Sequence, residues 1–387
     1  MKNFIYDIPT KIYFGDGQIK NLGAAVMAYG KKALLVYGGG SIKRNGLYDA
    51  AVASLDEAGI TVTELPGVEP NPRITTVREG AELCRKHGID VVVPIGGGST
   101  IDCGKVTAAA ALYDGDPWDL VLDGRKIKAA LPIVTVLTMA ATGSEMDSFA
   151  VISDWEAKNK FGTGSRHLLP KVSILDPKNT FSVPARQTAA GAADIMSHTI
   201  ENYFNRTDSA FLQNSIAEAI LKTCIKYAPV AVSHPEDYEA RANLMWASSL
   251  AINGLVSLGA PMAWSVHPME HELSAFYDIT HGIGLAILTP RWMQHILRED
   301  TLPKFVTYGV NVWGIDASLA PMEIAKTAIA KTYDFFASIG IPMNLSALGI
   351  GTDKLEVMAE RAERMGLRKA FVPLTAKDAL EIYKKSM

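Results

Sequence analysis

The sequence predicts an α/β domain with a parallel, Rossmann-like sheet, followed by an all-α domain. Short runs rich in β-branched residues alternate with helical stretches as far as about residue 176, and two of these runs end in three consecutive glycines. Such alternation is typical of crossover units that build a parallel sheet covered on both faces. After Pro184 the β-type runs disappear. We therefore expect an α/β domain at residues 1–184 and a helical domain at residues 185–387.

The expected strands of the first domain lie at residues 33–37, 60–65, 90–95 and 132–138, with helices at 47–58, 75–87 and 99–112 between them. Residues 149–153 and 171–175 are candidates for two further strands, which could be antiparallel. In the second domain apolar residues recur at helical spacing. Its expected helices lie at residues 188–203, 208–227, 237–252, 290–297, 322–339, 353–364 and 376–385.

Composition excludes several classes of protein. The 387 residues are 48% hydrophobic and 20% charged, with a net charge of −3, so neither disorder nor nucleic-acid binding is expected. Three scattered cysteines argue against a secreted disulfide framework. The start of the chain does not resemble a signal peptide, and the uncharged stretch 242–266 contains Gly259 and Pro261, which argue against a membrane span. The expected location is the cytoplasm.

Two glycine-rich turns are candidates for binding phosphate groups. Gly96, Gly97 and Gly98 follow an expected strand, and Ser99 opens the next helix. Glycines allow close approach of a ligand to the backbone, and a helix start presents unpaired N–H groups to a diphosphate. Three glycines in a row exceed what a tight turn needs, so we interpret this turn as a phosphate site.

The second turn indicates which dinucleotide is bound. Gly38, Gly39 and Gly40 follow the first expected strand, and Ser41, Lys43 and Arg44 come next. An acidic residue after this strand would hold a ribose 2′-hydroxyl and repel a 2′-phosphate. No acidic residue occurs from 34 to 48, and two cations are present instead. The pattern favours NADP(H) over NAD(H).

Histidines and one aspartate in the second domain predict a metal site. Asp194 and His198 are four residues apart on an expected helix and share one face. His267, His271 and His281 follow in one short segment, without the H-E-x-x-H zinc pattern. The cluster predicts that a divalent metal ion is bound. The spacing leaves open which of His267, His271 and His281 are its ligands.

The surroundings of these histidines favour a neutral substrate. From residue 242 to 290 there is no Lys or Arg to hold a phosphate or a carboxylate. Apolar and aromatic residues of this stretch could line a pocket, although core packing is the more common role of such residues. They are Trp246, Leu255, Met262, Trp264 and Phe276.

Taken together, these motifs resemble the iron-dependent alcohol dehydrogenase family over nearly the full chain, and within it the NADPH-dependent butanol dehydrogenase and aldehyde reductase branch. The resemblance rests on residues 9–15, 69–72, 96–99 with Asp102 and Lys105, 138–145, 190–194 with His198, and 267–271 with His281-Gly282. The Asp-x-x-x-His pair and the histidine segment are its most specific parts. One departure is the run Met139-Ala140-Ala141, where many members carry other small residues.

The resemblance implies roles that the residue pattern alone left open. It assigns the metal to Asp194, His198, His267 and His281, and it places His271 near the substrate as a candidate proton relay or a structural partner of the ligands. Iron(II) is the expected metal, with zinc(II) as its rival. It adds cofactor contacts to those of Gly38, Gly39, Gly40, Ser41 and Lys43, namely Asn71, Gly97, Gly98, Ser99, Asp102, Thr138, Thr142, Ser144 and Lys160.

The expected activity is metal-dependent hydride transfer between NADP(H) and a primary alcohol or aldehyde such as butanol or butanal. The expected partner is a small neutral substrate, and a homodimer is compatible with the sequence. Two alternatives remain. A lyase of the dehydroquinate synthase kind would need several cations near the metal, and a non-catalytic protein would use the same clusters for storage or structure.

Overall fold

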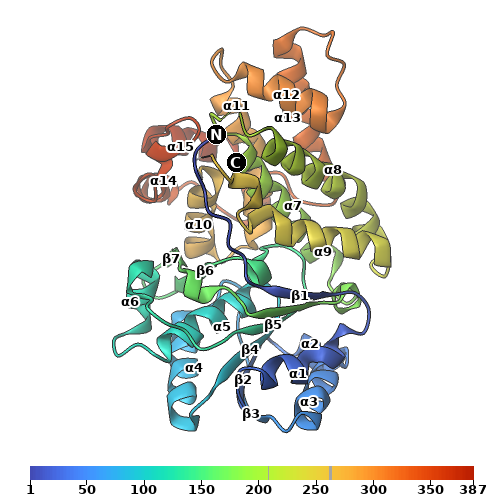
Figure 1. Ribbon diagram of the computed structural model, residues 1–387. Coiled ribbons are helices and arrows are strands. Elements are labelled where there is room, and N and C mark those ends of the chain that lie inside the picture. The colour runs from blue at the N-terminus through green and yellow to red at the C-terminus, as the bar shows by residue number, and fades with distance from the viewer. Residues whose placement is uncertain (208, 261–263) are drawn as a thin grey trace. The chain divides into compact units, whose positions relative to one another are not determined.

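The computed structural model describes residues 1–207, 209–260 and 264–387, which form two compact units (Figure 1). The α/β unit comprises Asp7–Val183 and Pro235–Ser249. The helical unit comprises Met1–Tyr6, Pro184–His234 and Leu250–Met387. An α/β fold with a Rossmann-like parallel sheet followed by a helical part confirms the predicted fold class.

The α/β unit is built on a six-stranded sheet in the order β1-β8-β5-β4-β2-β3, in which every pairing is parallel. Its strands are β1 (Lys11–Phe14), β2 (Lys32–Tyr37), β3 (Thr61–Leu65), β4 (Val91–Gly96), β5 (Val134–Leu137) and β8 (Val172–Leu175). A separate antiparallel hairpin joins β6 (Phe149–Asp154) to β7 (Asn159–Gly164).

Helices cover both faces of the sheet because successive strand residues point to opposite sides. Leu34 and Val36 pack in one core with residues of α4 and α5, whereas Ala33 and Leu35 pack in the other with residues of α1 and α3. The helices of this unit are α1 (Leu22–Met27), α2 (Ser41–Arg44), α3 (Leu47–Glu57), α4 (Ile74–His87), α5 (Gly98–Ala110) and α6 (Pro117–Leu122). Its 3-10 turns are Gln18–Asn21, Gly124–Lys126, Ser144–Met146, Arg166–Leu168 and Pro177–Thr180.

The strand predictions need two corrections. The possible antiparallel pairing is right for β6 but wrong for β8, which lies between β1 and β5 and is parallel to both. Strands β1 and β7 were not predicted. Both alternate poorly: β1 is half-exposed at the sheet edge, and β7 contains two glycines.

The helices of the second unit are α7 (Ala185–Tyr203), α8 (Phe211–Ser233), α10 (Val266–Tyr277), α11 (His281–Ile296), α12 (Leu302–Trp313), α13 (Pro321–Ser338), α14 (Leu355–Arg364) and α15 (Ala376–Lys385). Its 3-10 turns are Leu255–Ser257, Ser346–Leu348 and Leu367–Lys369. The predicted helix start at residue 290 is wrong, because α11 begins at His281 and accommodates Pro290 in its interior. Helices α10 and α12 were not predicted, and the expected start at Asp208 lies outside the described residues.

Helix α9 (Tyr238–Ile252) departs from the simple division of the chain at residue 184, because its residues as far as Ser249 belong to the α/β unit. Met245 packs with Ile101, Leu137 and Leu175 of that unit. The Ser248 hydroxyl accepts a hydrogen bond from the Ala141 N–H at 3.1 Å. These contacts explain why residues from the second half of the sequence join the first unit.

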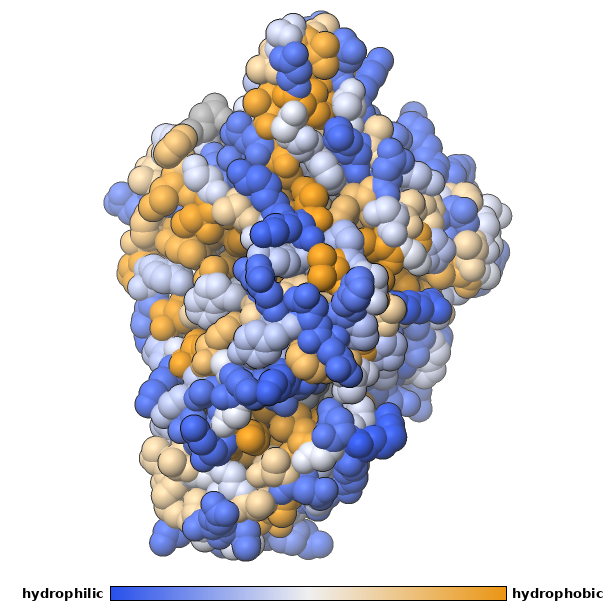
Figure 2. Space-filling model, turned by 90° about the vertical axis from the view of Figure 1, so that its right-hand side faces the viewer, coloured by the Kyte–Doolittle hydropathy of each residue, from blue (hydrophilic) through white to orange (hydrophobic). Residues whose placement is uncertain are grey.

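Across the described residues, none of the helices combines the length and the hydropathy needed to cross a bilayer. On the face drawn in Figure 2, hydrophobic residues gather in several patches that charged and polar residues separate.

Candidate metal centre and nucleotide site

The candidate metal centre begins on α7, a helix that is buried from Thr188 to Tyr203. Asp194 and His198 lie one turn apart on it, and their side chains are only 4% and 6% exposed. The Nδ1 atom of His198 is 3.5 Å from Oδ1 of Asp194. The i,i+4 spacing therefore places both side chains on one face, as the sequence predicted.

Helices α10 and α11 bring two more histidines to Asp194. Nε2 of His267 lies 3.9 Å from Oδ1 of Asp194, and Nε2 of His281 lies 3.8 Å from the same oxygen. The potential ligand atoms of Asp194, His267 and His281 all lie within 4.8 Å of one another. His198 stacks on His267 with ring centroids 4.6 Å apart but is not part of this group of three.

Two buried glutamates hold the rings of His267 and His281. A carboxylate oxygen of Glu201 contacts Nδ1 of His267, and a carboxylate oxygen of Glu270 contacts Nδ1 of His281. With Nδ1–H donated to a carboxylate, Nε2 carries the lone pair. Both Nε2 atoms then face Asp194, which is the arrangement that a shared metal ion requires.

Each glutamate is itself fixed by further hydrogen bonds. Glu201 also accepts the backbone N–H groups of Val266 at 2.7 Å and of His267 at 3.3 Å, so it caps the start of α10. Glu270 is fully buried and also accepts the hydroxyl of Ser274. The orientation of both histidines is thus built into the fold.

Close packing of α11 against α7 brings His281 next to Asp194. A Cβ atom at Gly282 would lie 1.9 Å from the carbonyl oxygen of Ala190, so no larger residue fits there without moving a backbone. In the motif His281-Gly282, the candidate ligand is followed directly by the glycine that allows α11 to pack closely against α7.

The polar groups of this centre fit a divalent cation. Within the described part of the chain, the buried atoms His267 Nε2 and His198 Nδ1 make no hydrogen bond. Burial is the main cause that holds the pKa of His198 well below its usual value and keeps that imidazole neutral. Neutral imidazoles and a carboxylate are the ligand set of Fe(II), Zn(II), Mn(II) and Co(II) sites.

The other predicted residues of this region are only partly gathered here. His271 is buried on α10, and its ring centroid lies 5.6 Å from that of His281. The ring of Trp264 contacts those of His198 and His267 at 5.9 and 4.8 Å. Phe276 instead lies under the guanidinium of Arg361. Trp246 belongs to the α/β unit, where it contacts Phe14, and Met262 lies outside the described residues.

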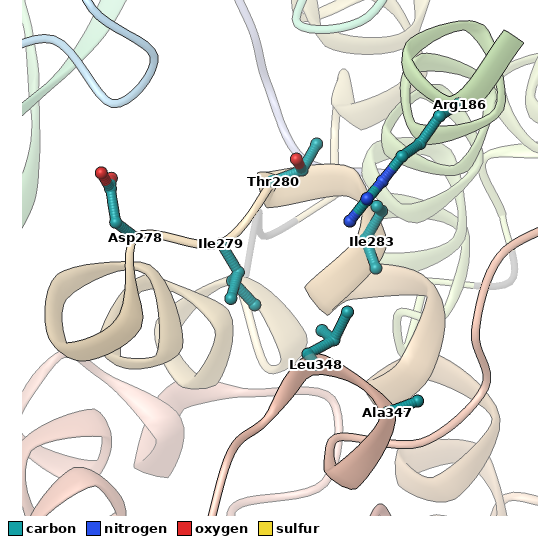
Figure 3. Close-up of a pocket in the computed structure, with 7 residues that line it drawn as sticks. All are labelled: Arg186, Asp278, Ile279, Thr280, Ile283, Ala347 and Leu348. Atoms are coloured by element: carbon teal, nitrogen blue, oxygen red, sulfur yellow. The ribbon is translucent and has the colours of Figure 1, made fainter.

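A pocket of about 380 Å³ opens at the start of α11, where Thr280 and Ile283 line it. Figure 3 shows Arg186 of α7 extending toward Ile283, while Asp278 lies on the far side of the pocket. Thr280, Ile279, Ala347 and Leu348 complete the lining. A cation and a carboxylate thus both border this pocket, although the stretch 242–290 contains no Lys or Arg.

The two glycine-rich turns meet at one edge of the parallel sheet. Tyr37, at the end of β2, pairs with Ile95, near the end of β4, so both turns leave the sheet side by side. The chain runs from β2 outward to β3 and then returns to β4 on the other side of β2. Ligands of such sheets bind at the carboxyl ends of the strands where the order reverses. Both glycine-rich turns that the sequence predicts to bind the cofactor lie at this point.

The triple glycine at residues 96–98 has a packing reason as well. A Cβ atom at Gly98 would lie 2.3 Å from Oγ1 of Thr142, so Gly98 lets the 138–144 loop approach the start of α5. Ser99 lies half-buried in the first turn of α5. Thr138 donates its N–H to the carbonyl of Gly96 at 3.0 Å. Gly97, Gly98, Ser99, Thr138 and Thr142 are therefore neighbours.

Asp102 and Ser144 hold this region together. The Ser144 hydroxyl donates to Oδ1 of Asp102 at 2.5 Å, and the Val151 N–H donates to Oδ2 at 2.8 Å. Burial raises the pKa of Asp102 to about 6. Their visible role is to join α5 to the following loop and to β6.

Asn71 and Lys160 are both buried polar residues of the α/β unit, at 8% and 4% exposure. Asn71 has a φ of 53°, a left-handed conformation that is uncommon outside glycine and often found at functional sites. Lys160 on β7 pairs with Ser153 of β6.

The turn after β2 is open where a ligand would lie. A Cβ atom at Gly39 would meet no atom within 4 Å. Lys43, however, is already engaged: its Nζ lies 3.8 Å from Glu64 and above the rings of Tyr37 and Tyr48, at 5.0 and 4.4 Å. Glu64 was not predicted as part of this site, because only residues 34–48 were searched for an acidic residue. Strand β3, which pairs with β2, places Glu64 next to Lys43.

The sequence analysis also did not predict that Glu201 and Glu270 contact the candidate metal ligands. A signal was present in the spacing, because Glu201 follows Asp194 by seven residues and Glu270 follows His267 by three, which places each on the ligand face of its helix.

The chain is similar to known proteins over nearly its full length. The family model described as iron-containing alcohol dehydrogenase matches residues 9–177, and that described as the C-terminal part of the Fe-containing alcohol dehydrogenase family matches residues 188–387. The NADH-dependent butanol dehydrogenase A of Clostridium acetobutylicum is 59% identical over 388 residues, covering 100% of both chains.

More distant relatives differ in the cofactor that they are named for. The NADPH-dependent aldehyde reductase YqhD of Escherichia coli is 37% identical and covers 95% of this chain and 94% of its own. Among solved structures, the NADH-dependent butanol dehydrogenase A of Thermotoga maritima has a TM-score of 0.95 at 38% identity, covering 100% of this chain and 99% of its own.

Proposed function

This chain belongs to the iron-containing alcohol dehydrogenase family, and from that premise we propose that it reduces neutral medium-chain aldehydes with NADP(H) at a metal held by Asp194, His198, His267 and His281. Alcohol and aldehyde oxidoreduction with a nicotinamide cofactor follows from the family and its butanol dehydrogenase relatives. The lyase and non-catalytic alternatives are therefore set aside.

The observation that carries the metal proposal is the convergence of Asp194, His267 and His281, with both Nδ1 atoms turned to buried glutamates. His198, one turn from Asp194 and stacked on His267, is the proposed fourth ligand. When bound, a divalent cation supplies a Lewis acid for the substrate oxygen. Iron(II) is our expectation and zinc(II) its rival, because the ligand set suits both.

The chain's own residues would supply position and proton transfer. Helices α7, α10 and α11 fix the ligand side chains before substrate arrives, which lowers the cost of ordering them. His271, buried on α10 beside His281, is the proposed relay for the proton that the alcohol oxygen gains or loses. A purely structural role for His271 predicts an unchanged pH profile in His271→Gln, whereas a relay predicts a lost inflection in kcat.

The NADP(H) proposal rests on Gly39 and the cations beside it. Gly39 is exposed with open space at its Cβ position, and no carboxylate of its own loop would repel a 2′-phosphate. Lys43 and Arg44 on α2 supply positive charge. Two of the similar proteins are named as NADH-dependent, so the preference between NADPH and NADH has to be measured for this chain. With butanal fixed, kcat/KM should be higher for NADPH than for NADH, and the reverse order would refute the cofactor proposal.

Chelation tests the metal independently of the cofactor. Dialysis against a chelator should abolish butanal reduction and leave NADP⁺ binding intact, because the glycine turns and the metal centre belong to different units. Readdition of Fe(II) or Zn(II) under anaerobic conditions shows which ion restores turnover. Full activity in a sample with no detectable metal would contradict the proposed mechanism.

A further inference from the structure

Strand β3 places a carboxylate beside the turn that is proposed to hold the adenosine end of the cofactor. In the first β-α-β unit, formed by β2, α3 and β3, the glycine turn follows β2 and Glu64 lies near the carboxyl end of β3. Dinucleotide-binding folds carry their ribose-binding acid at this place, about 20 residues after the glycine turn. The topology of the unit therefore gives Glu64 that position.

The carboxylate of Glu64 is held at a defined place and in its charged form. The hydroxyl of Tyr48 donates to its Oε1 at 2.6 Å, and the hydroxyl of Tyr37 donates to its Oε2. These hydrogen bonds hold the pKa of Glu64 below its ordinary value. The rings of Tyr37 and Tyr48 pack edge to face, 5.7 Å apart, so the two donors support each other.

Glu64 also pairs with Lys43, a cation that would otherwise attract a 2′-phosphate. Nζ of Lys43 lies 3.8 Å from Glu64 and above both tyrosine rings. The side chains of Lys43 and Glu64 are 48% and 38% exposed, so a ligand can reach them. A paired Lys43 offers less attraction to a phosphate than an unpaired one.

We propose that Glu64 is a specificity-determining residue that limits the preference of this enzyme for 2′-phosphorylated cofactors and supports use of NAD(H). The Glu64 carboxylate accepts a hydrogen bond from a ribose 2′-hydroxyl, repels a 2′-phosphate and neutralises Lys43. The proposal rests on the proposed nucleotide site at the β2 turn but not on a net preference for NADP(H). It also explains how a chain without an acid from residue 34 to 48 can resemble NADH-dependent relatives.

Binding of two adenine nucleotides tests the proposal without turnover or metal. Adenosine 5′-diphosphate and its 2′-phosphorylated counterpart differ only at the 2′ position, so the ratio of their Kd values isolates that position. Glu64→Gln keeps the size of the side chain and an acceptor for Tyr48. It should shift the ratio toward the 2′-phosphorylated ligand by roughly 5- to 10-fold. Glu64→Asp, which keeps the charge, should shift it much less.

Two controls separate this role from general charge and from folding. Glu57→Gln removes one exposed negative charge from the end of α3 in the same β-α-β unit and should leave the ratio unchanged. Lys43→Met should reduce affinity for the 2′-phosphorylated ligand more strongly in the Glu64→Gln background than in the wild type, since Glu64 no longer neutralises the lysine.

The outcomes are distinguishable from those of the cofactor proposal. The wild-type ratio of NADPH to NADH activity decides the net preference, whereas the change of the Kd ratio on substitution decides the role of Glu64. An unchanged ratio in Glu64→Gln, with an unaltered unfolding transition, would overturn the inference and leave Glu64 as a structural partner of Lys43 and the tyrosines. Failure of both nucleotides to bind the wild type would overturn the site itself.

Discussion

Replacement of Glu270 tests whether the proposed metal centre is prearranged by the residues around it. Glu270→Ala removes a fully buried carboxylate that contacts Nδ1 of His281 and accepts the hydroxyl of Ser274. Ser274 is then buried and His281 partly buried without that acceptor, at a cost of about 1–3 kcal/mol each. We expect the apo protein to lose about 2–5 kcal/mol of stability.

Loss of this carboxylate also frees the ring of His281 to turn. Partners of metal-ligating histidines typically contribute 10- to 100-fold in metal affinity, so Glu270→Ala should weaken binding by roughly that factor. Glu270→Gln retains an acceptor for Nδ1–H and an amide for Ser274, and should recover most of the affinity. Ser274→Ala leaves the contact between Glu270 and His281 in place and serves as the matched control.

Metal affinity is measured on purified apo protein by competition with a chromophoric chelator, and coordination geometry by the visible spectrum of the Co(II) form. Urea unfolding of the apo variants gives the stability change separately. If Glu270→Ala bound metal as tightly as the wild type and gave the same Co(II) spectrum, His281 would not depend on Glu270 for its orientation, and the reasoning would be refuted.

The remaining predictions concern metal, cofactor, substrate and pH. His267→Ala should lose both its metal, measured by elemental analysis, and its turnover, while still binding NADP⁺. If the variant kept its metal and its turnover, His267 would not be a ligand. Gly39→Asp should shift the kcat/KM ratio toward NADH by roughly 10- to 150-fold, or ~1–3 kcal/mol, because the new carboxylate would repel a 2′-phosphate. Values of kcat/KM should rise a few-fold per carbon from acetaldehyde to butanal, since each buried methylene contributes ~0.8 kcal/mol. A four-carbon aldehyde with a terminal carboxylate should react more slowly than butanal. If it reacts equally fast in the wild type and more slowly in Arg186→Gln, then Arg186 of the pocket in Figure 3 binds the carboxylate. Burial raises the pKa of Glu145 from its ordinary value of 4.5 to about 7, so wild-type stability should fall by up to about 3 kcal/mol as pH rises from 4.5 through 7. Between pH 5 and pH 8 in urea unfolding, Glu145→Gln should show a smaller fall than the wild type, because only the part due to Asp102 and other raised carboxyls remains. An identical pH dependence of the two proteins would contradict the assignment.

The α/β architecture was predictable because its signals are local. A buried parallel strand such as β4 is a continuous apolar run, and the turns at residues 38–40 and 96–98 show where strands end. The strands that were missed or misassigned lack such signals. β1 is half-exposed, β7 contains glycines, and the direction of β8 depends on which neighbours it meets in the sheet.

One predicted helix boundary, at residue 290, is wrong because a proline lies inside the helix. The sequence predicts a helix that begins at Pro290, a residue that fits the first turn of a helix better than its interior because its ring removes an N–H donor. In the structure α11 runs from His281 to Ile296 and contains Pro290, with extensive burial of the flanking residues from Gly282 to Thr289. Tertiary packing of a buried helix thus outweighs the local penalty of one proline.

The candidate metal centre shows how much of a site residue spacing alone can predict. Asp194, His198 and Glu201 fall at i, i+4 and i+7 on α7, and this polar stripe on a buried helix was readable from the sequence. What spacing does not state is which histidine of another helix meets that stripe. His267 and His271 are one turn apart on α10, and both are buried.

The choice between these two histidines is made by Glu201, through a contact between residues 66 positions apart in the chain. Glu201 accepts the Nδ1–H of His267 and the N–H groups at the start of α10, so it fixes the helix and the ring together. The ring of His271, one turn further along, lies 5.6 Å from that of His281 and 6.3 Å from that of His267. A carboxylate at the helix start therefore selects the first histidine as the one whose Nε2 faces Asp194, and no pattern within α10 could have revealed it.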